Sequence, residues 1–221
     1  MAFRFYLRHT SFWKTLMFNF HYFPFRTAIK FPVLISKKVR LLKLKGRLHL
    51  GMIEKGIVKI GFFDNTPIFD YKKDFFLFSN EGEIHFRGKC KLGSGSKIDV
   101  ESGAKLLFGK NFRITSNSSI RCKKYISFGD DCLISWNTQF LDGDYHSILI
   151  DGIKANPDSE ISIGNHVWVC CDSLILKGTS VADGCVIGAG SVLCGKSYDP
   201  HCLIAGVPGI EIKKDIDWSV E

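Results

Sequence analysis

The first fifty residues of this 221-residue chain contain no aspartate or glutamate, although they carry eleven lysines and arginines. The whole chain has a formal net charge of +8, and the part after residue 50 sums to −3. The basic character therefore belongs to one end of the chain. The same end is rich in aromatic residues, namely Phe3, Phe5, Tyr6, Phe12, Trp13, Phe18, Phe20, Tyr22, Phe23, Phe25 and Phe31.

That end also lacks a long apolar run. Arg4, Arg8 and Lys14 interrupt any signal-peptide core. The longest uncharged run, Thr15–Phe25, is too short to span a membrane and contains Asn, His and Pro. Two interpretations stay open. Residues 1–45 either lie on an anionic membrane surface as a peripheral segment, or form a basic helical cap on the rest of the protein. No recognised nucleic-acid-binding motif accompanies the charge, so we expect no nucleic-acid partner.

The eight cysteines include no CxxC pair and no zinc-finger spacing. Scattered in apolar segments, they behave as small hydrophobic residues. This usage predicts a reducing compartment, and hence a cytoplasmic protein, without a disulfide framework.

What the chain does have is an internal repeat. Five segments align without gaps from Phe86, Phe108, Phe128, Ile163 and Val181. Six and twelve residues after each start the residue is again large and apolar, and ten residues after it is Ser or Thr. A six-residue period fits neither a helix nor simple strand alternation, and indicates short strands joined by turns. Three such hexads make one turn of a three-sided prism, whose coils must stack to bury their inner faces.

The repeat sets the predicted domain boundaries. Residues 1–46 are the basic aromatic segment, expected to be partly helical, and 47–85 are irregular strands that start and cap the prism. Residues 86–205 are the repeat itself, with an inserted loop at 143–160 where the step between starts widens to 35 residues. Residues 206–221 are a short C-terminal segment.

Several motifs of the repeat region and the inserted loop resemble those of a known family. The motifs "ISIGNHVWV", "ILKGTSVADGCVIGAGSVL" and "IAGVPGIEIKK", with the histidine of "DGDYH", are similar to those of hexapeptide-repeat acyltransferases. The resemblance covers roughly residues 84–218 and is nearest to bacterial acetyltransferases of surface polysaccharides. It implies an all-β fold, a left-handed parallel β-helix. It also implies a homotrimer, and acetyl-CoA as co-substrate with a sugar hydroxyl as acceptor.

Acetyl transfer to a hydroxyl needs a base, and an imidazole with an ordinary pKa of about 6.5 suits that task at neutral pH. The family carries its catalytic histidine on such an inserted loop, which points to His146. Asp144 is the candidate to orient the ring by accepting its other N–H. Asp142 shares that possibility, or forms the turn of "DGD" and faces the acceptor.

The remaining candidates follow from the resemblance alone. Asn117, Trp136 and Trp168 are expected to bind the acceptor. The predicted contacts to acetyl-CoA are Cys171, Gly188, Ala189, Cys194, Gly195 and Lys213. Cysteines stand at 171 and 194 where relatives often have Ser or Thr, and Gly195 stands where some have Lys.

Other functions remain open on the sequence alone. N-acetylation of an amino sugar would use the same fold and histidine. Serine acetyltransferases carry a long N-terminal helical domain that is missing here. A β-helical carbonic anhydrase would need three histidines converging on zinc, and His85, His146, His166 and His201 are the candidates; we expect no metal. A non-catalytic scaffold is the last alternative, against which "DGDYH" and "VWV" both count.

Overall fold

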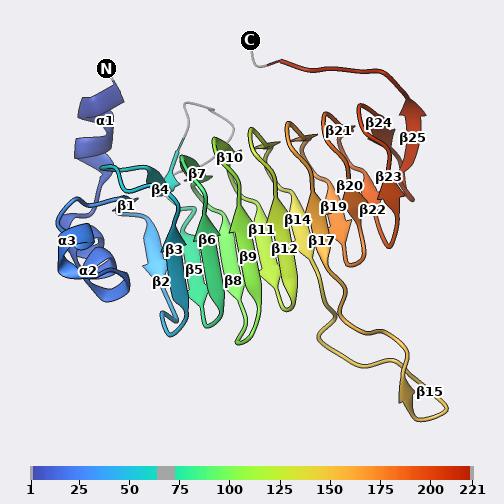
Figure 1. Ribbon diagram of the computed structural model, residues 1–221, viewed down its shortest axis with the longest axis horizontal. Coiled ribbons are helices and arrows are strands. Elements are labelled where there is room, and N and C mark those ends of the chain that lie inside the picture. The colour runs from blue at the N-terminus through green and yellow to red at the C-terminus, as the bar shows by residue number, and fades with distance from the viewer. Residues whose placement is uncertain (1, 64–72, 220–221) are drawn as a thin grey trace.

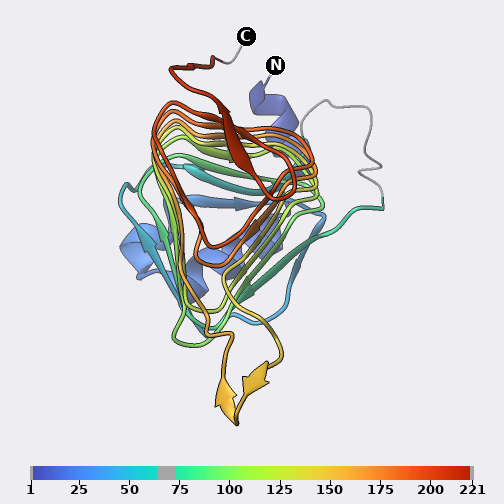
Figure 2. The ribbon, with the colours of Figure 1, turned by 90° about the vertical axis from the view of Figure 1, so that its right-hand side faces the viewer.

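The computed structural model describes residues 2–63 and 73–219. Three helices come first: α1 (Ala2–His9), α2 (Phe12–Tyr22) and α3 (Phe25–Ala28). They cover one end of a long stack of strands, and the stack has a triangular outline when viewed along its axis (Figures 1 and 2). No helix among the described residues is long and apolar enough to cross a membrane.

Three parallel sheets form the sides of the prism. The first sheet holds, in spatial order, β1 (Val33–Ile35), β4 (Val58–Phe62), β7 (Cys90–Gly93), β10 (Phe112–Ile114), β13 (Leu133–Ile134), β18 (Trp168–Val169), β21 (Val186–Ile187), β24 (Leu203–Ala205) and β25 (Ile210–Lys213). Strand β25 is the exception to the parallel order, because it pairs antiparallel with β24 at the C-terminal end.

The second sheet holds β2 (Val39–Leu41), β5 (Phe76–Asn80), β8 (Lys97–Val100), β11 (Ser119–Cys122), β14 (Gln139–Leu141), β19 (Leu174–Leu176) and β22 (Val192–Leu193). The third sheet holds β3 (Arg47–Leu50), β6 (Glu83–Phe86), β9 (Lys105–Phe108), β12 (Tyr125–Phe128), β17 (Ile161–Ile163), β20 (Ser180–Val181) and β23 (Ser197–Tyr198). A separate antiparallel pair, β15 (Leu149–Ile150) and β16 (Ile153–Lys154), lies in the inserted loop.

The three repeat positions correspond to the three sheets. Each segment start, such as Phe108, lies in the third sheet; the residue six further on lies in the first, and the residue twelve further on lies in the second. All of these side chains are buried. The small residues ten positions on, Ser96, Ser118, Thr138, Ser173 and Ser191, are also buried, where the chain turns from the first sheet into the second. The structure thus confirms the predicted left-handed parallel β-helix.

The coils begin earlier than the predicted boundaries place them. Strands β1 and β2 lie within residues 1–46, yet they pair in parallel with β4 and β5 and so belong to the prism. The first coils are long and uneven, because 25 residues separate Val33 from its partner Val58. This length hides the six-residue period. Residues 64–72, part of the predicted segment 47–85, lie outside the described residues.

Candidate active site

The inserted loop leaves the prism at the corner between the second and third sheets (Figure 2). In the neighbouring coils this corner is a tight turn, Lys123–Lys124 before the loop and 177–179 after it. The loop occupies 142–160, between β14 and β17, and projects away from the body of the molecule (Figure 1). Two lysines, Lys123 and Lys177, therefore lie on either side of its base.

Asp142 fixes the point at which the loop departs. Its side chain is fully buried. One carboxylate oxygen accepts the backbone N–H of Lys123 at 2.7 Å, and the other accepts those of Lys124 at 2.8 Å and Tyr125 at 2.7 Å. Because both oxygens are occupied by the backbone of the preceding coil, this carboxylate has a structural role and does not face an acceptor.

Asp144 is held by a cation instead. Its Oδ2 accepts hydrogen bonds from Lys177 Nζ and from Asn156 Nδ2, each at 2.6 Å. The hydrogen bond from Lys177 is the main reason why the pKa of Asp144 lies below its ordinary value of 3.8, and the Asn156 amide contributes next. On the other side of the loop base, Lys123 Nζ donates to the backbone oxygen of Asp144 at 2.9 Å.

Asn156 folds the loop around His146. Its Nδ2 donates to the backbone oxygen of His146 at 2.9 Å, and its Oδ1 accepts the backbone N–H of Ile148 at 2.6 Å. Asn156 is only 8% exposed. Asn156 and Lys177 were not predicted, since nothing in their sequence spacing shows that Asn156 closes the loop or that Lys177 reaches it from the next coil.

The backbone of His146 is therefore fixed, whereas its side chain is exposed. Among the described residues its imidazole has no hydrogen-bond partner, and the predicted donation from the ring N–H to the Asp144 carboxylate is not formed. Before it, the Tyr145 ring lies 3.9 Å from the guanidinium carbon of Arg121. After it, the tip of the loop presents four exposed apolar side chains, Ile148, Leu149, Ile150 and Ile153. His146, the candidate base, thus lies next to the apolar loop tip. No other part of this subunit covers that tip among the described residues.

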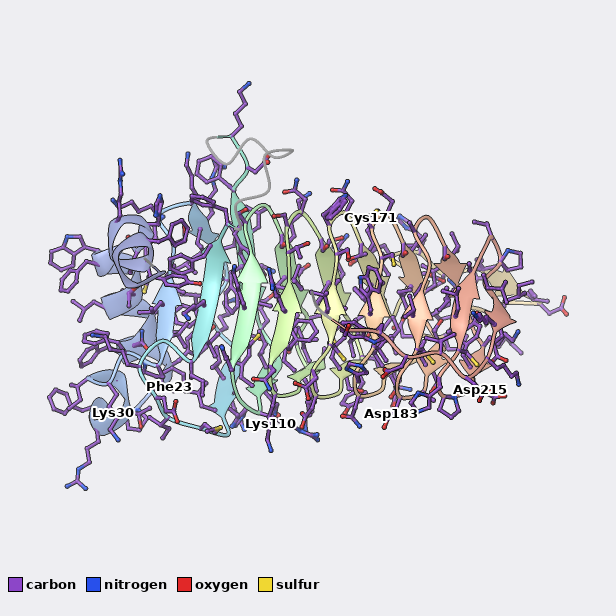
Figure 3. All side chains as sticks on the ribbon, turned by 90° about the horizontal axis from the view of Figure 1, so that it is seen from above. Phe23, Lys30, Lys110, Cys171, Asp183 and Asp215 are labelled. Carbon is purple, nitrogen blue, oxygen red and sulfur yellow. The ribbon has the colours of Figure 1, made fainter. Side chains whose placement is uncertain are left out.

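The other predicted residues lie at different corners. Asn117, Trp136, Cys171, Gly188 and Ala189 lie where the first sheet turns into the second. Cys194 and Gly195 lie at the corner that carries the loop, two coils further on. Lys213 is exposed at the end of β25. Figure 3 shows Cys171 and Asp183 on opposite edges of the prism, which illustrates how widely one subunit separates its corners. A single chain does not bring these residues together around His146.

Asn117 and Trp168 have structural contacts. Asn117 has a φ of +50° and donates its backbone N–H to the Ser94 oxygen at 2.9 Å, as a turn residue does. Trp168 Nε1 donates to Ser135 Oγ at 3.1 Å, and its ring centroid lies 5.9 Å from that of Trp218.

The C-terminal tail folds back onto the first sheet, which the sequence did not reveal. The Trp218 ring stacks on His166, with centroids 4.4 Å apart and an interplanar angle of 8°. Its Nε1 also donates to the His166 backbone oxygen at 2.8 Å. Trp168 and the tail therefore form one aromatic patch on that sheet.

The four histidines considered for zinc do not converge. His146 is on the loop, His166 and His201 are corner residues with positive φ, and His85 lies in β6. Within residues 2–63 and 73–219, one group of side chains is close enough to share a metal, namely His49, Glu83 and His85. It does not include His146, so the arrangement gives no support to a carbonic anhydrase.

Two sequence relatives cover more than half of the chain. A protein named for the cps region of Klebsiella pneumoniae is 29% identical over 202 residues, 90% of this chain and 86% of its own length. A protein of Escherichia coli K12, provisionally named lipopolysaccharide biosynthesis O-acetyl transferase WbbJ, is 30% identical over 61% of this chain and 74% of its own length. No protein-family model matches the chain.

Among solved structures, the polySia specific acetyltransferase NeuO superposes with a TM-score of 0.59 at 21% identity, over 86% of this chain and 79% of its own. With the prism and the loop histidine, these relatives place the chain in the hexapeptide-repeat acyltransferase family, as an O-acetyltransferase.

Proposed function

We propose that this enzyme transfers an acetyl group from acetyl-CoA to a sugar hydroxyl during the synthesis of a bacterial surface polysaccharide. The observation that carries the proposal is the loop, whose backbone is held by Asn156 and Asp142 while His146 is left exposed. The names of the relatives support the choice of acceptor. One is provisionally assigned to lipopolysaccharide biosynthesis, and another is the polysialic acid O-acetyltransferase of Neisseria meningitidis.

In this mechanism His146 acts as the general base. Its imidazole takes the proton of the sugar hydroxyl as the oxygen attacks the thioester carbonyl. The tetrahedral intermediate then collapses, the C–S bond breaks, and the imidazolium returns the proton to the departing thiolate. The products are the sugar ester and the coenzyme A thiol. Backbone N–H groups at a turn would stabilise the oxyanion.

The corner that carries the loop offers a path for the donor. Gly178 and Gly195 succeed each other at this corner, both with positive φ, and a Cβ built on Gly178 would lie 3.2 Å from the Gly195 Cα. A Cβ built on Gly195 would meet nothing within 4 Å. Two stacked glycines leave a strip without side chains, which suits the narrow pantetheine arm of acetyl-CoA. Cys194 would border this strip, and Cys171, Gly188, Ala189 and Lys213 would come from a second subunit or from the C-terminal end.

The separation of the predicted residues supports a homotrimer. If three prisms pack side by side, the loop corner of one faces the first–second corner of its neighbour. His146 would then meet Cys171 and Gly188 across the interface. We further place the enzyme in the cytoplasm at the inner face of the membrane, because its eight cysteines are all free and its basic end suits anionic lipid.

The test is acetyl-CoA turnover with purified glycan acceptors, measured as release of the thiol. We expect His146→Ala to lower kcat by about 10²–10⁴-fold, the usual contribution of a general base. Coenzyme A affinity should change little because the proposed donor contacts come from later coils, and the melting temperature should change little because the side chain is exposed. Near-normal turnover in this variant would contradict the mechanism. A much lower melting temperature would instead give His146 a structural role.

A further inference from the structure

Helix α2 covers the open end of the prism with a side that buries Phe18 together with two polar residues. Thr15 and Asn19 are buried and hydrogen-bond the free edge of β1: Thr15 Oγ1 accepts the Ile35 N–H at 3.1 Å, and Asn19 Nδ2 donates to the Val33 oxygen at 2.8 Å. Lys14 Nζ likewise donates to the Val39 oxygen at 2.7 Å. An exposed sheet edge invites pairing with other chains, and this helix blocks it.

The opposite side of the same helix is apolar and faces outward. Trp13 is 75% exposed and Phe12 65% exposed, and α3 adds Phe25 at 68%. The surface, called the end face below, consists of Phe12, Trp13, Met17, Phe20, Phe25 and Ile29. The Phe20 and Phe25 ring centroids lie 5.9 Å apart, so the two helices form one continuous surface. A helix that already buries one side, with Phe18 in the core, and still exposes Phe12 and Trp13 on the other marks a contact with something outside the subunit.

The charge around the end face identifies that contact. No acidic residue occurs before Glu54, and Arg26 and Lys30 are exposed on or next to α3. Figure 3 shows Lys30 at the helical end of the molecule. Aromatic rings flanked by cations, with no anion nearby in the sequence, match the interface of an anionic bilayer. A protein partner of the usual mixed charge would not need this one-sided composition.

We propose that the end face binds an anionic membrane so that the prism axis stands along the membrane normal. This orientation sets the height of the catalytic loop. Four strand-to-strand steps separate β1 from β13, the strand just before the loop coil. At about 4.8 Å a step, the base of the loop that carries His146 lies roughly 20 Å further from the membrane than the first coil. Resting on the proposed function, the acceptor is therefore a lipid-linked glycan long enough to present a hydroxyl at that height.

A trimer would strengthen the contact. A threefold axis parallel to the prisms places three end faces in one plane, so that each bound subunit raises the effective concentration of the other two at the lipid.

The experiment is flotation of the purified full-length enzyme with vesicles of phosphatidylglycerol and phosphatidylcholine, or of phosphatidylcholine alone. We expect recovery with the anionic vesicles at low salt, and loss at high salt or with neutral lipid. Reversing two cations, Arg26→Glu with Lys30→Glu, should weaken partitioning at least about 25-fold, because each cation near the surface contributes about fivefold. The matched control is Lys89→Glu with Lys110→Glu, which changes the net charge by the same amount. Both residues are exposed midway along the prism, so this variant should bind vesicles as the wild type does.

A second measurement tests whether the apolar end face, and with it this end of the prism, inserts into the bilayer. Brominated acyl chains should quench the emission of Trp13, and Trp13→Phe should remove that quenching while leaving the other three tryptophans unaffected. Three results would overturn the proposal. They are equal binding to neutral and anionic vesicles, an equal loss of binding in the end-face and control charge variants, and quenching that persists in Trp13→Phe. Absence of vesicle binding would leave a protein as the occupant and would overturn it too. Turnover of a water-soluble acceptor should be unchanged in the end-face variants, which separates this proposal from the proposed function.

Discussion

Two aspartates separated by one glycine have different roles. Asp142 accepts three backbone N–H groups and is fully buried, so it belongs to the corner rather than to the chemistry. Asp144 is partly exposed and faces Lys177. The motif "DGD" alone could not separate the two, because the difference lies in which coil each carboxylate contacts. We therefore treat Asp144 as a positioning residue that holds the loop through Lys177 and Asn156.

Asp144→Asn and Lys177→Gln should each lower kcat by about 10-fold, well below the loss in His146→Ala. The double variant should be little worse than either single, because both changes break one interaction. The lowered pKa of Asp144 shows that the folded state stabilises the ionised carboxylate, and this adds to the free energy of unfolding. That contribution is present above the ordinary pKa of 3.8 and is lost as the pH falls through the lower pKa of the folded state. At a half-exposed pair it is worth at most about 1 kcal/mol.

The pH dependence of kcat provides the check on Asp144. Between pH 5 and 8 this carboxylate stays ionised, so the acid limb of the profile should be the same in the wild type and in Asp144→Asn. An acid limb that moves in the variant, or fully additive losses in the double variant, would contradict a positioning role.

At the scale of elements, the sequence predicted the strands of the hexad repeat but not the elements without a period, namely the first coils, the fold of the loop and the C-terminal tail. The hexad positions predicted all three sheets from Phe86 onward, because each large side chain must fill one inner face of the prism. Strands β1 and β2 were not predicted because the long connections of the first coils hide the period, although both are full members of their sheets. The fold of the loop around Asn156 and the docking of Trp218 on His166 depend on single long-range contacts, which leave no period in the sequence.

The inner phenylalanines make the prism wall sensitive to truncation. Phe128 is fully buried, stacks on Phe108 at a centroid distance of 5.7 Å, and contacts Phe112 and Phe140 at 4.8 and 4.9 Å. Phe128→Ala should lower the free energy of unfolding by about 3–5 kcal/mol, because the coils on either side cannot close the cavity. Ser127→Ala, on the outward side of the same strand, should change it by less than about 0.5 kcal/mol. Urea unfolding of both variants gives the comparison, and similar midpoints would show that the aromatic stack adds little to stability.

At the scale of the whole molecule, one prism divides the predicted site residues between corners. Cys194 and Gly195 share the corner of the His146 loop, the predicted donor contacts Cys171 and Gly188 lie at another, and the loop tip exposes Ile150 at 62% and Ile153 at 73%. Apolar side chains exposed to this extent on a projecting loop favour a contact with a second copy. A closed trimer would satisfy all three features, because each loop would reach the neighbouring corner and bury its tip there.

Sedimentation equilibrium at micromolar concentration should therefore give about three times the chain mass of 24.9 kDa. Ile150→Asp with Ile153→Asp should shift the protein to smaller species and reduce turnover together, because a charged tip cannot be buried against the neighbour. Ile53→Asp, an exposed apolar position at the corner between the third and first sheets, which the proposed trimer leaves free, should leave both the mass and the turnover unchanged. A wild-type monomer with full activity would mean that one subunit holds a complete site, and the division of the predicted residues among corners would then need another explanation.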